Sequence, residues 1–141
     1  MKYFICALEG TQLGIPAEWT ERIISTDRIQ TALYETEPFP DNSGKNELFI
    51  SLPVLFRLKD RAAPHGLVLK SGGKGDNAAP GRTVLLTPKI DIELDIPEAN
   101  IHRLPESFAG LYRCIQGACF SNQNIILLLD PEKLVETLPH D

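Results

Sequence analysis

The chain has 141 residues, 43% of them hydrophobic, which is enough to form one domain with a buried core. Its 11 prolines and 10 glycines indicate many short elements separated by turns, which favours strands over long helices. A formal net charge of −5 and the lack of any Lys/Arg cluster argue against nucleic acid as a partner.

The N-terminal third begins with an apolar run over residues 3–8, a turn at Glu9 and Gly10, and a second run over 12–15. This pattern predicts a β-hairpin. Residues 17–24 are ambiguous, and a short helical turn leading into a strand is one interpretation. Residues 25–45 are predicted to be a loop because turn-forming residues crowd their second half: Pro38, Pro40, Asp41, Asn42 and Gly44.

The middle of the chain predicts strands. Residues 48–55 are rich in strand formers, with Pro53 at an edge or a strand end because proline lacks an amide donor. Residues 67–69 and 83–86 are expected to pair across a flexible connection at 71–77. Residues 90–96 alternate strictly, which predicts Ile92 and Leu94 in the core and the carboxylates of Asp91, Glu93 and Asp95 in water.

The C-terminal part predicts two further strands, over residues 112–119 and 125–129, around a polar turn at 121–124. Asp130 is expected to be the N-cap of a short helix through residue 138, with Pro131 at its first position. About nine strands and one terminal helix place the chain in the all-β class.

Several patterns suggest chemistry but fit a structural role better. The glycine-rich stretch at 72–75 has Val68 and Gly75 where a phosphate-binding loop needs glycine and serine or threonine. Asp91, Glu93 and Asp95 lie about 7 Å apart on one strand face, which is typical of a solvated face and less so of a metal site. Trp19 is either a binding hot spot or a core residue.

The remaining candidates do not form a catalytic set. His65, His102 and His140 are far apart and lack the neighbours that a hydrolase requires. Cys6, Cys114 and Cys119 have no C-x-x-C spacing, so we expect small buried side chains with neither a disulfide nor a metal. We therefore expect no cofactor, no metal and no enzymatic activity.

The sequence shows neither a signal peptide nor an apolar stretch of about 18 residues that could span a membrane. We expect a cytoplasmic protein without direct membrane insertion.

The order and spacing of these segments resemble the CheW family. The resemblance covers nearly the whole chain and is sharpest near the C-terminus, where Gly117 and Asp130 fall at the family's spacing and have structural roles. The residues that carry it are Tyr112-Arg113-Cys114-Ile115-Gln116-Gly117-Ala118, residues 121–124, Ile125-Ile126-Leu127-Leu128-Leu129-Asp130 and Pro131-Glu132-Lys133-Leu134. Residues 85–105 also match the family without a gap.

The resemblance implies a single CheW-like domain over residues 1–141, built from two small five-stranded β-barrels that share a hydrophobic core. It also implies an adaptor that couples chemoreceptors to a CheA-type histidine kinase through protein contacts. One barrel would dock on the kinase, and a groove between the barrels would receive the receptor's cytoplasmic tip. By resemblance, Ile15, Ile23 and Ile24 would line this groove, although each of them could instead be a core residue.

One departure from the family bears on function. Family members usually carry a segment like Asn-Leu-Arg-Gly before the middle strand, with an arginine important for coupling, and here that region reads Gly44-Lys45-Asn46-Glu47-Leu48. An alternative function is therefore a divergent domain that has lost kinase coupling and binds another signalling protein or itself. A small-ligand-binding barrel is the third alternative.

Overall fold

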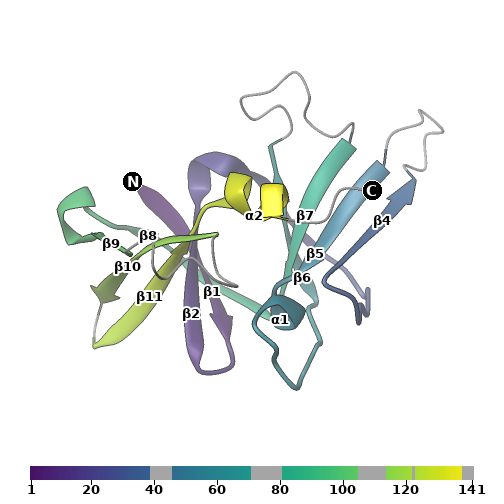
Figure 1. Ribbon diagram of the computed structural model, residues 1–141, viewed down its shortest axis with the longest axis horizontal. Coiled ribbons are helices and arrows are strands. Elements are labelled where there is room, and N and C mark those ends of the chain that lie inside the picture. Colours follow the sequence, from purple (N-terminus) through teal and green to yellow (C-terminus); the bar gives the residue numbers. More distant parts are fainter. Residues whose placement is uncertain (39–45, 71–80, 105–113, 122, 138–141) are drawn as a thin grey trace. The chain divides into compact units, whose positions relative to one another are not determined.

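The computed structural model describes residues 1–38, 46–70, 81–104, 114–121 and 123–137 (Figure 1). Strands dominate it, which confirms the predicted all-β class. The strands are β1 (Lys2–Leu8), β2 (Thr11–Pro16), β3 (Thr20–Ser25), β4 (Tyr34–Pro38), β5 (Asn46–Ser51), β6 (His65–Leu69), β7 (Gly81–Thr87), β8 (Lys89–Asp95), β9 (His102–Arg103), β10 (Ile115–Ser121) and β11 (Asn124–Leu129). The helical elements are η1 (Ala17–Trp19), α1 (Leu52–Leu55), η2 (Glu98–Asn100) and α2 (Pro131–Thr137).

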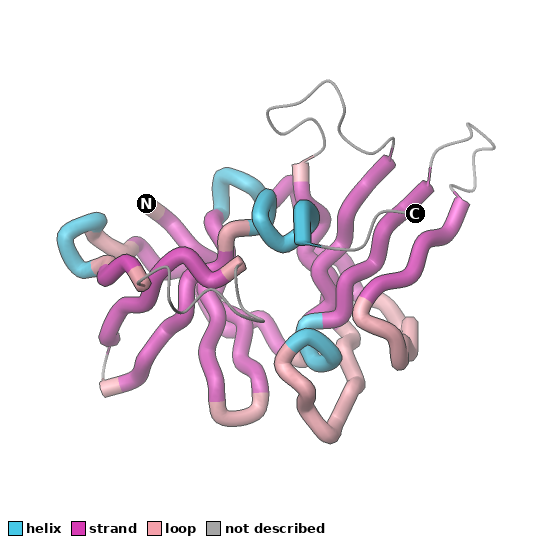
Figure 2. Tube along the Cα trace, in the orientation of Figure 1, coloured by secondary structure: helices cyan, strands magenta, loops and turns pink. Residues whose placement is uncertain are grey.

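The chain divides into two compact units (Figure 2). Residues 1–19 and 91–141 form the first, with a six-stranded sheet in the order β8-β1-β2-β11-β10-β9; residues 20–90 form the second, with a five-stranded sheet in the order β3-β6-β7-β5-β4. The two expected β subdomains correspond to these two sheets; one of them has six strands where five were expected, and within the described residues neither strand order closes into a barrel. That the two units act as one domain stays a prediction.

Two hairpins joined by a parallel pairing build the first unit. The predicted N-terminal hairpin is confirmed, with β1 and β2 antiparallel and Gly10 at a φ of 74°, a conformation that glycine adopts without strain. β10 and β11 form the second hairpin, and β11 runs parallel to β2 so that Leu128 lies opposite Gly14. The side chains on one face form a core cluster: Tyr3, Ile5, Ile96, Cys119, Ile126 and Leu128.

The second unit is organised around β7. Its antiparallel pairing with β6 confirms the strand pair expected from residues 67–69 and 83–86, whereas the connection at 71–77 lies outside the described residues. On its other side β7 runs parallel to β5, and β3 and β4 form the two edges. Five of the buried side chains of this unit form a core cluster: Phe49, Ala63, Val68, Val84 and Leu86.

Two local predictions are wrong. Part of the predicted loop at 25–45 is strand β4, antiparallel to β5 from the pair Tyr34 and Ile50 onward. The strand predicted over residues 48–55 ends at Ser51, whose side chain accepts a hydrogen bond from the Val54 N–H and caps the one-turn helix α1. Pro53 lies in the first turn of that helix, where a missing amide hydrogen is tolerated.

Strand β8 confirms only part of the predicted alternation. Asp91, Glu93 and Asp95 are exposed, and Leu94 packs against the core of the first unit as expected. Ile92, however, is 58% exposed, so its assignment to the core is wrong. The physical reason is that β8 is an edge strand of its sheet, and Ile92 lines an open pocket beside it.

The C-terminal helix α2 begins with a side-chain cap. The Asp130 Oδ1 accepts hydrogen bonds from the backbone N–H groups of Glu132 and Lys133, at 3.1 and 3.3 Å, and Pro131 occupies the first helical position. The Asp130 N–H in turn donates to the Cys114 carbonyl at 2.7 Å, which fixes the start of the helix beside β10. Among the described residues, no helix is long and apolar enough to cross a membrane.

Replacing Asp130 tests this cap. Asp130→Ala should lower the free energy of unfolding by about 1 kcal/mol, because two amide groups at the start of α2 lose their acceptor. Asp130→Asn keeps an acceptor oxygen and should lower the free energy of unfolding by only a few tenths of a kcal/mol. Urea denaturation measures both changes, and an Asp130→Ala protein as stable as the wild type would contradict the role of the cap.

Candidate functional site

The three residues predicted to line a groove differ in burial. Ile15 lies on β2, an inner strand of its sheet, and is fully buried, which is the core position that the sequence left open as the alternative. Ile24 lies on β3 and packs partly against the core of the second unit. Ile23, its neighbour on β3, is 45% exposed. Ile23 is therefore the member of this set that offers an apolar surface to a partner.

The first unit contains an open pocket of about 290 Å³ beside β8, here called the β8 pocket. Its lining residues come from both hairpins and from β8. Because β8 and β10 are four places apart in the strand order, the sheet must curl for both strands to line the same pocket. The lining residues are Ile5, Gln12, Asp91, Ile92, Leu94, Ser121, Asn124 and Ile126. The sequence indicated this place only indirectly, through the unbroken alternation of residues 90–96.

The β8 pocket is lined by apolar side chains together with the polar side chains of Asp91, Ser121, Gln12 and Asn124. Buried Ile5 and Ile126 contribute apolar surface together with the more open Ile92, while Gln12 and Asn124 contribute amide groups. Apolar surface beside a few polar groups is typical of sites that bind a side chain or a small molecule. No histidine or cysteine is among the lining residues, and the described residues contain no group of three potential metal ligands.

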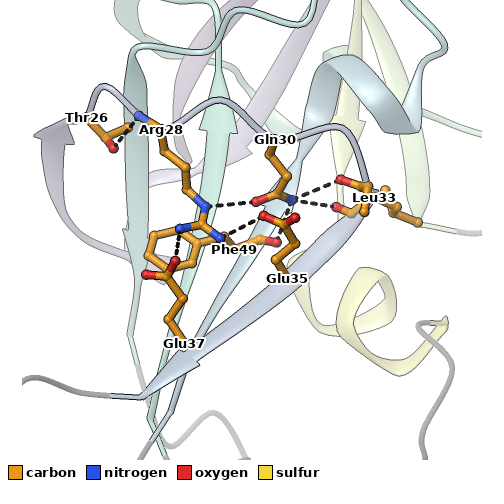
Figure 3. A network of polar contacts seen from close by, with 8 residues as sticks. Thr26, Arg28, Gln30, Leu33, Glu35, Glu37 and Phe49 are labelled. Atoms are coloured by element: carbon orange, nitrogen blue, oxygen red, sulfur yellow. Dashed lines mark hydrogen bonds and ion pairs between the residues drawn. The ribbon is translucent and has the colours of Figure 1, made fainter.

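A polar network in the second unit centres on Arg28 (Figure 3). The Arg28 guanidinium donates to Glu35 at 2.8 Å, to Glu37 at 2.5 Å and to Gln30 at 3.0 Å, and it lies 4.1 Å from the centroid of the Phe49 ring. Burial alone would lower the pKa of Arg28, but the hydrogen bonds and charges of Glu37 and Glu35 raise it above its ordinary value. The guanidinium thus stays charged and fixed.

Gln30 extends this network to the backbone. Its side chain is 2% exposed, and its Nε2 donates to the carbonyls of Ala32, Leu33 and Phe49 at 2.9 to 3.2 Å. Arg28 and Gln30 together fasten the irregular segment 26–33 to strands β4 and β5. This network was not predicted, because its members come from a stretch of sequence without periodicity. The glutamates at alternate positions 35 and 37 are the signal that could have indicated it.

The other candidates are scattered or lie outside the described residues. His65 is half-buried on β6, while His102 is exposed on β9 with its ring edge-on to Phe120. Trp19 is half-buried in η1. The glycine-rich stretch at 72–75 and His140 fall outside the described residues.

Gly117 occupies a position of close backbone approach. A Cβ atom at this residue would lie 2.9 Å from the His102 carbonyl oxygen, closer than real side chains approach a backbone oxygen. Gly117 is also the residue of β10 that pairs with Arg103 of β9. Because glycine has no Cβ, the backbone of β9 can pair closely with β10 at this position.

The three cysteines are buried, as expected from their apolar surroundings in the sequence. Burial, and secondarily the charge of Asp130, raises the pKa of the Cys114 thiol to about 11. Burial also raises the pKa of Cys119. Both shifts work against the thiolate, which is the nucleophilic form.

Replacing Arg28 tests the polar network. Arg28→Met retains the apolar stem but leaves Glu35 and Glu37 without their shared cation, so we expect a loss of about 1–3 kcal/mol in the free energy of unfolding. Arg28→Lys should recover only part of it because an ammonium lacks the planar fork. Arg22→Met, at an exposed position on β3, is the matched control and should change stability by less than about 0.5 kcal/mol. Equal losses for the Arg28 and Arg22 variants would contradict the network's role.

Thiol reactivity tests the assignment of the cysteines. At about pH 8 the native protein should react with DTNB far more slowly than the denatured protein, because burial hinders access and the raised thiol pKa values deplete the thiolate. Absorbance at the released thiolate's maximum measures the rate. A thiol in the native protein that reacts as fast as in denaturant would show an accessible, activated cysteine.

Comparison with known proteins identifies a similar fold but no relative by sequence. No family model matches the sequence, and no curated protein matches it. Among solved structures, the fold is similar to that of the scaffolding protein TtCheW from Thermoanaerobacter tengcongensis, with a TM-score of 0.68 and 14% sequence identity. The match covers 91% of this chain and 87% of that chain. The chain therefore has a CheW-like fold, at an identity that establishes the fold alone.

Proposed function

We propose that the chain is a non-enzymatic, cytoplasmic adaptor that couples chemoreceptors to a CheA-type histidine kinase through protein contacts. The observation that carries this proposal is the fold likeness to a scaffolding protein over 91% of the chain. The match covers most of both chains, so the similarity in fold extends beyond one hairpin or one sheet.

The described residues support a function in binding other proteins through the molecular surface. The charged side chains that come together have structural roles, such as Arg28 with Glu35 and Arg82 with Glu47. Large apolar side chains are exposed on strands of both units, including Ile23 on β3 and Ile92 on β8. Exposed aliphatics with a polar surround are the usual material of a protein interface.

A specific observation favours a second function, a CheW-like domain that has lost kinase coupling and binds another signalling protein. The region where the family carries its coupling arginine reads Gly44 to Leu48 here, without arginine. Within it, Glu47 lies on β5 and forms an ion pair with Arg82 of β7. An acidic residue with a structural partner cannot replace an exposed arginine in a coupling contact.

Charge substitution at Ile23 tests the adaptor function. The wild-type chain should bind the CheW-like regulatory domain of a histidine kinase, or a receptor cytoplasmic tip, from its own organism. Ile23→Asp should weaken that binding at least about tenfold because it puts a carboxylate into an apolar contact. Its melting temperature should stay within about 2 °C of the wild type, since Ile23 is already 45% exposed. Biolayer interferometry and thermal denaturation give the two measurements.

Ile29→Asp is the matched control. Ile29 is 83% exposed in the same unit, so its substitution brings the same change of charge away from β3 and should leave binding unchanged. If the wild-type chain binds neither the kinase domain nor the receptor tip at tens of micromolar, coupling is refuted and the divergent-domain function takes its place.

A further inference from the structure

Three exposed cations follow helix α1 within five residues, in a segment here called the basic turn. They are Arg57, Lys59 and Arg61. In the described part of the chain none of the three forms an ion pair, whereas Arg28 and Arg82 of the same unit are both paired with glutamates. The charges of the basic turn are therefore open to an outside partner, in a chain whose formal net charge is −5.

Hydrogen bonds hold the backbone of the basic turn in place. The N–H groups of Arg57 and Leu58 donate to carbonyls of α1, at 3.1 and 2.8 Å, in the pattern that commonly closes a helix. At the other end of the turn, the Arg61 guanidinium donates to the Thr31 carbonyl of segment 26–33, at 3.1 Å. The cations thus extend from an ordered backbone, which lowers the entropic cost of binding.

The acidic residues beside the basic turn do not cancel its charge. Asp60 lies within the turn, and its Oδ1 accepts a hydrogen bond from the Ala62 N–H at 2.9 Å. Asp27 is the exposed acidic residue of the adjoining segment 26–33. Three cations against these two carboxylates leave a positive local charge, which attracts an acidic partner.

Arg57 occupies a backbone conformation in which glycine is the usual residue. Its φ is 56°, and it follows Phe56, the last residue of the α1 cap, at the position where many helices end in glycine. A residue with a Cβ is strained in this left-handed conformation. Because glycine would serve the fold better, the arginine side chain indicates a function besides folding.

The spacing of the three cations favours a row of carboxylates over a single phosphate group. They occupy every second position, and among the described residues no shared acceptor draws them together. A phosphate group would need several donors that converge on one point. Three cations in an acidic chain also lack the extended basic field of a nucleic-acid face.

We propose that the basic turn binds an acidic segment of a partner protein. The carboxylates of that segment contact the three cations, and its apolar side chains pack on Leu55 and Leu58, which are half-buried beside them. Charge complementarity selects a partner more than it adds affinity, so the contact is weak and sensitive to salt. It forms whether or not the chain also couples a receptor to a kinase.

An alternating glutamate–leucine heptapeptide titrated into the ¹⁵N-labelled full chain tests this proposal. Amide signals of residues 55–62 should shift, with a dissociation constant below about 1 mM in low salt. Binding should weaken at least about fivefold in roughly 0.5 M salt, which screens exposed charges. No shift up to about 1 mM peptide, equal binding of a glutamine–leucine peptide, or tighter binding of a uridine oligonucleotide at the same residues overturns the proposal.

Two matched double variants separate a local site from attraction by net charge. Arg57→Gln with Lys59→Gln removes two charges from the basic turn and should weaken peptide binding at least about fivefold. Arg22→Gln with Lys70→Gln removes two exposed charges elsewhere in the same unit and should bind like the wild type. Equal weakening by the two double variants would show attraction by net charge alone and would overturn the proposal.

Arg57→Gly separates binding from folding. Glycine relieves the left-handed strain, so the melting temperature should stay equal or rise, whereas peptide binding should weaken about threefold because one cation is lost. Thermal denaturation and the same titration measure the two effects. A variant that binds as tightly as the wild type, or one that melts at a lower temperature, would show that the arginine serves the fold and would overturn its role in binding.

Discussion

The parallel contact between β2 and β11 is the constraint on which the first unit depends. It joins the two ends of the sequence, because Gln12 and Gly14 lie opposite Ile126 and Leu128. Glycine at position 14 leaves room for Leu128, since a Cβ there would lie 2.8 Å from the Leu128 Cδ2 and the leucine side chain would have to shift. Each hairpin forms locally, but neither buries its apolar face alone, so the core of this unit exists only after the long-range pairing has closed.

The sequence was sufficient to predict the fold class and much of the strand arrangement where patterns are local. The N-terminal hairpin, the pair of β6 and β7 and the start of α2 follow from apolar runs, turn residues and a capping aspartate. β4 was missed because its residues, Tyr34 to Pro38, are mostly polar and end in proline. Arg28, in the neighbouring segment, forms ion pairs with Glu35 and Glu37. The alternate glutamates are visible in the sequence, but they do not indicate which cation they contact.

The candidate sites were less predictable than the fold, since exposure depends on a residue's place in the finished sheet. Ile15 and Ile92 lie in equally regular apolar patterns, yet Ile15 is fully buried and Ile92 is 58% exposed. The difference is that β2 has neighbours on both sides, whereas β8 is an edge strand. Alternation fixes which side chains share a face; strand order, which the sequence does not state, decides whether anything covers that face.

The edge strands of the two sheets differ in how far their edges are protected. β4 ends in Pro38, and its glutamates are held by Arg28, which is how natural sheets blunt an edge. β9 is only two residues long, which blunts its edge in another way. β3 and β8 differ from both, because each carries an isoleucine about half exposed, Ile23 and Ile92. The two isoleucines belong to different units, and of these two strands only β8 has carboxylates at every second position, so the exposed isoleucines lie in different charge surroundings.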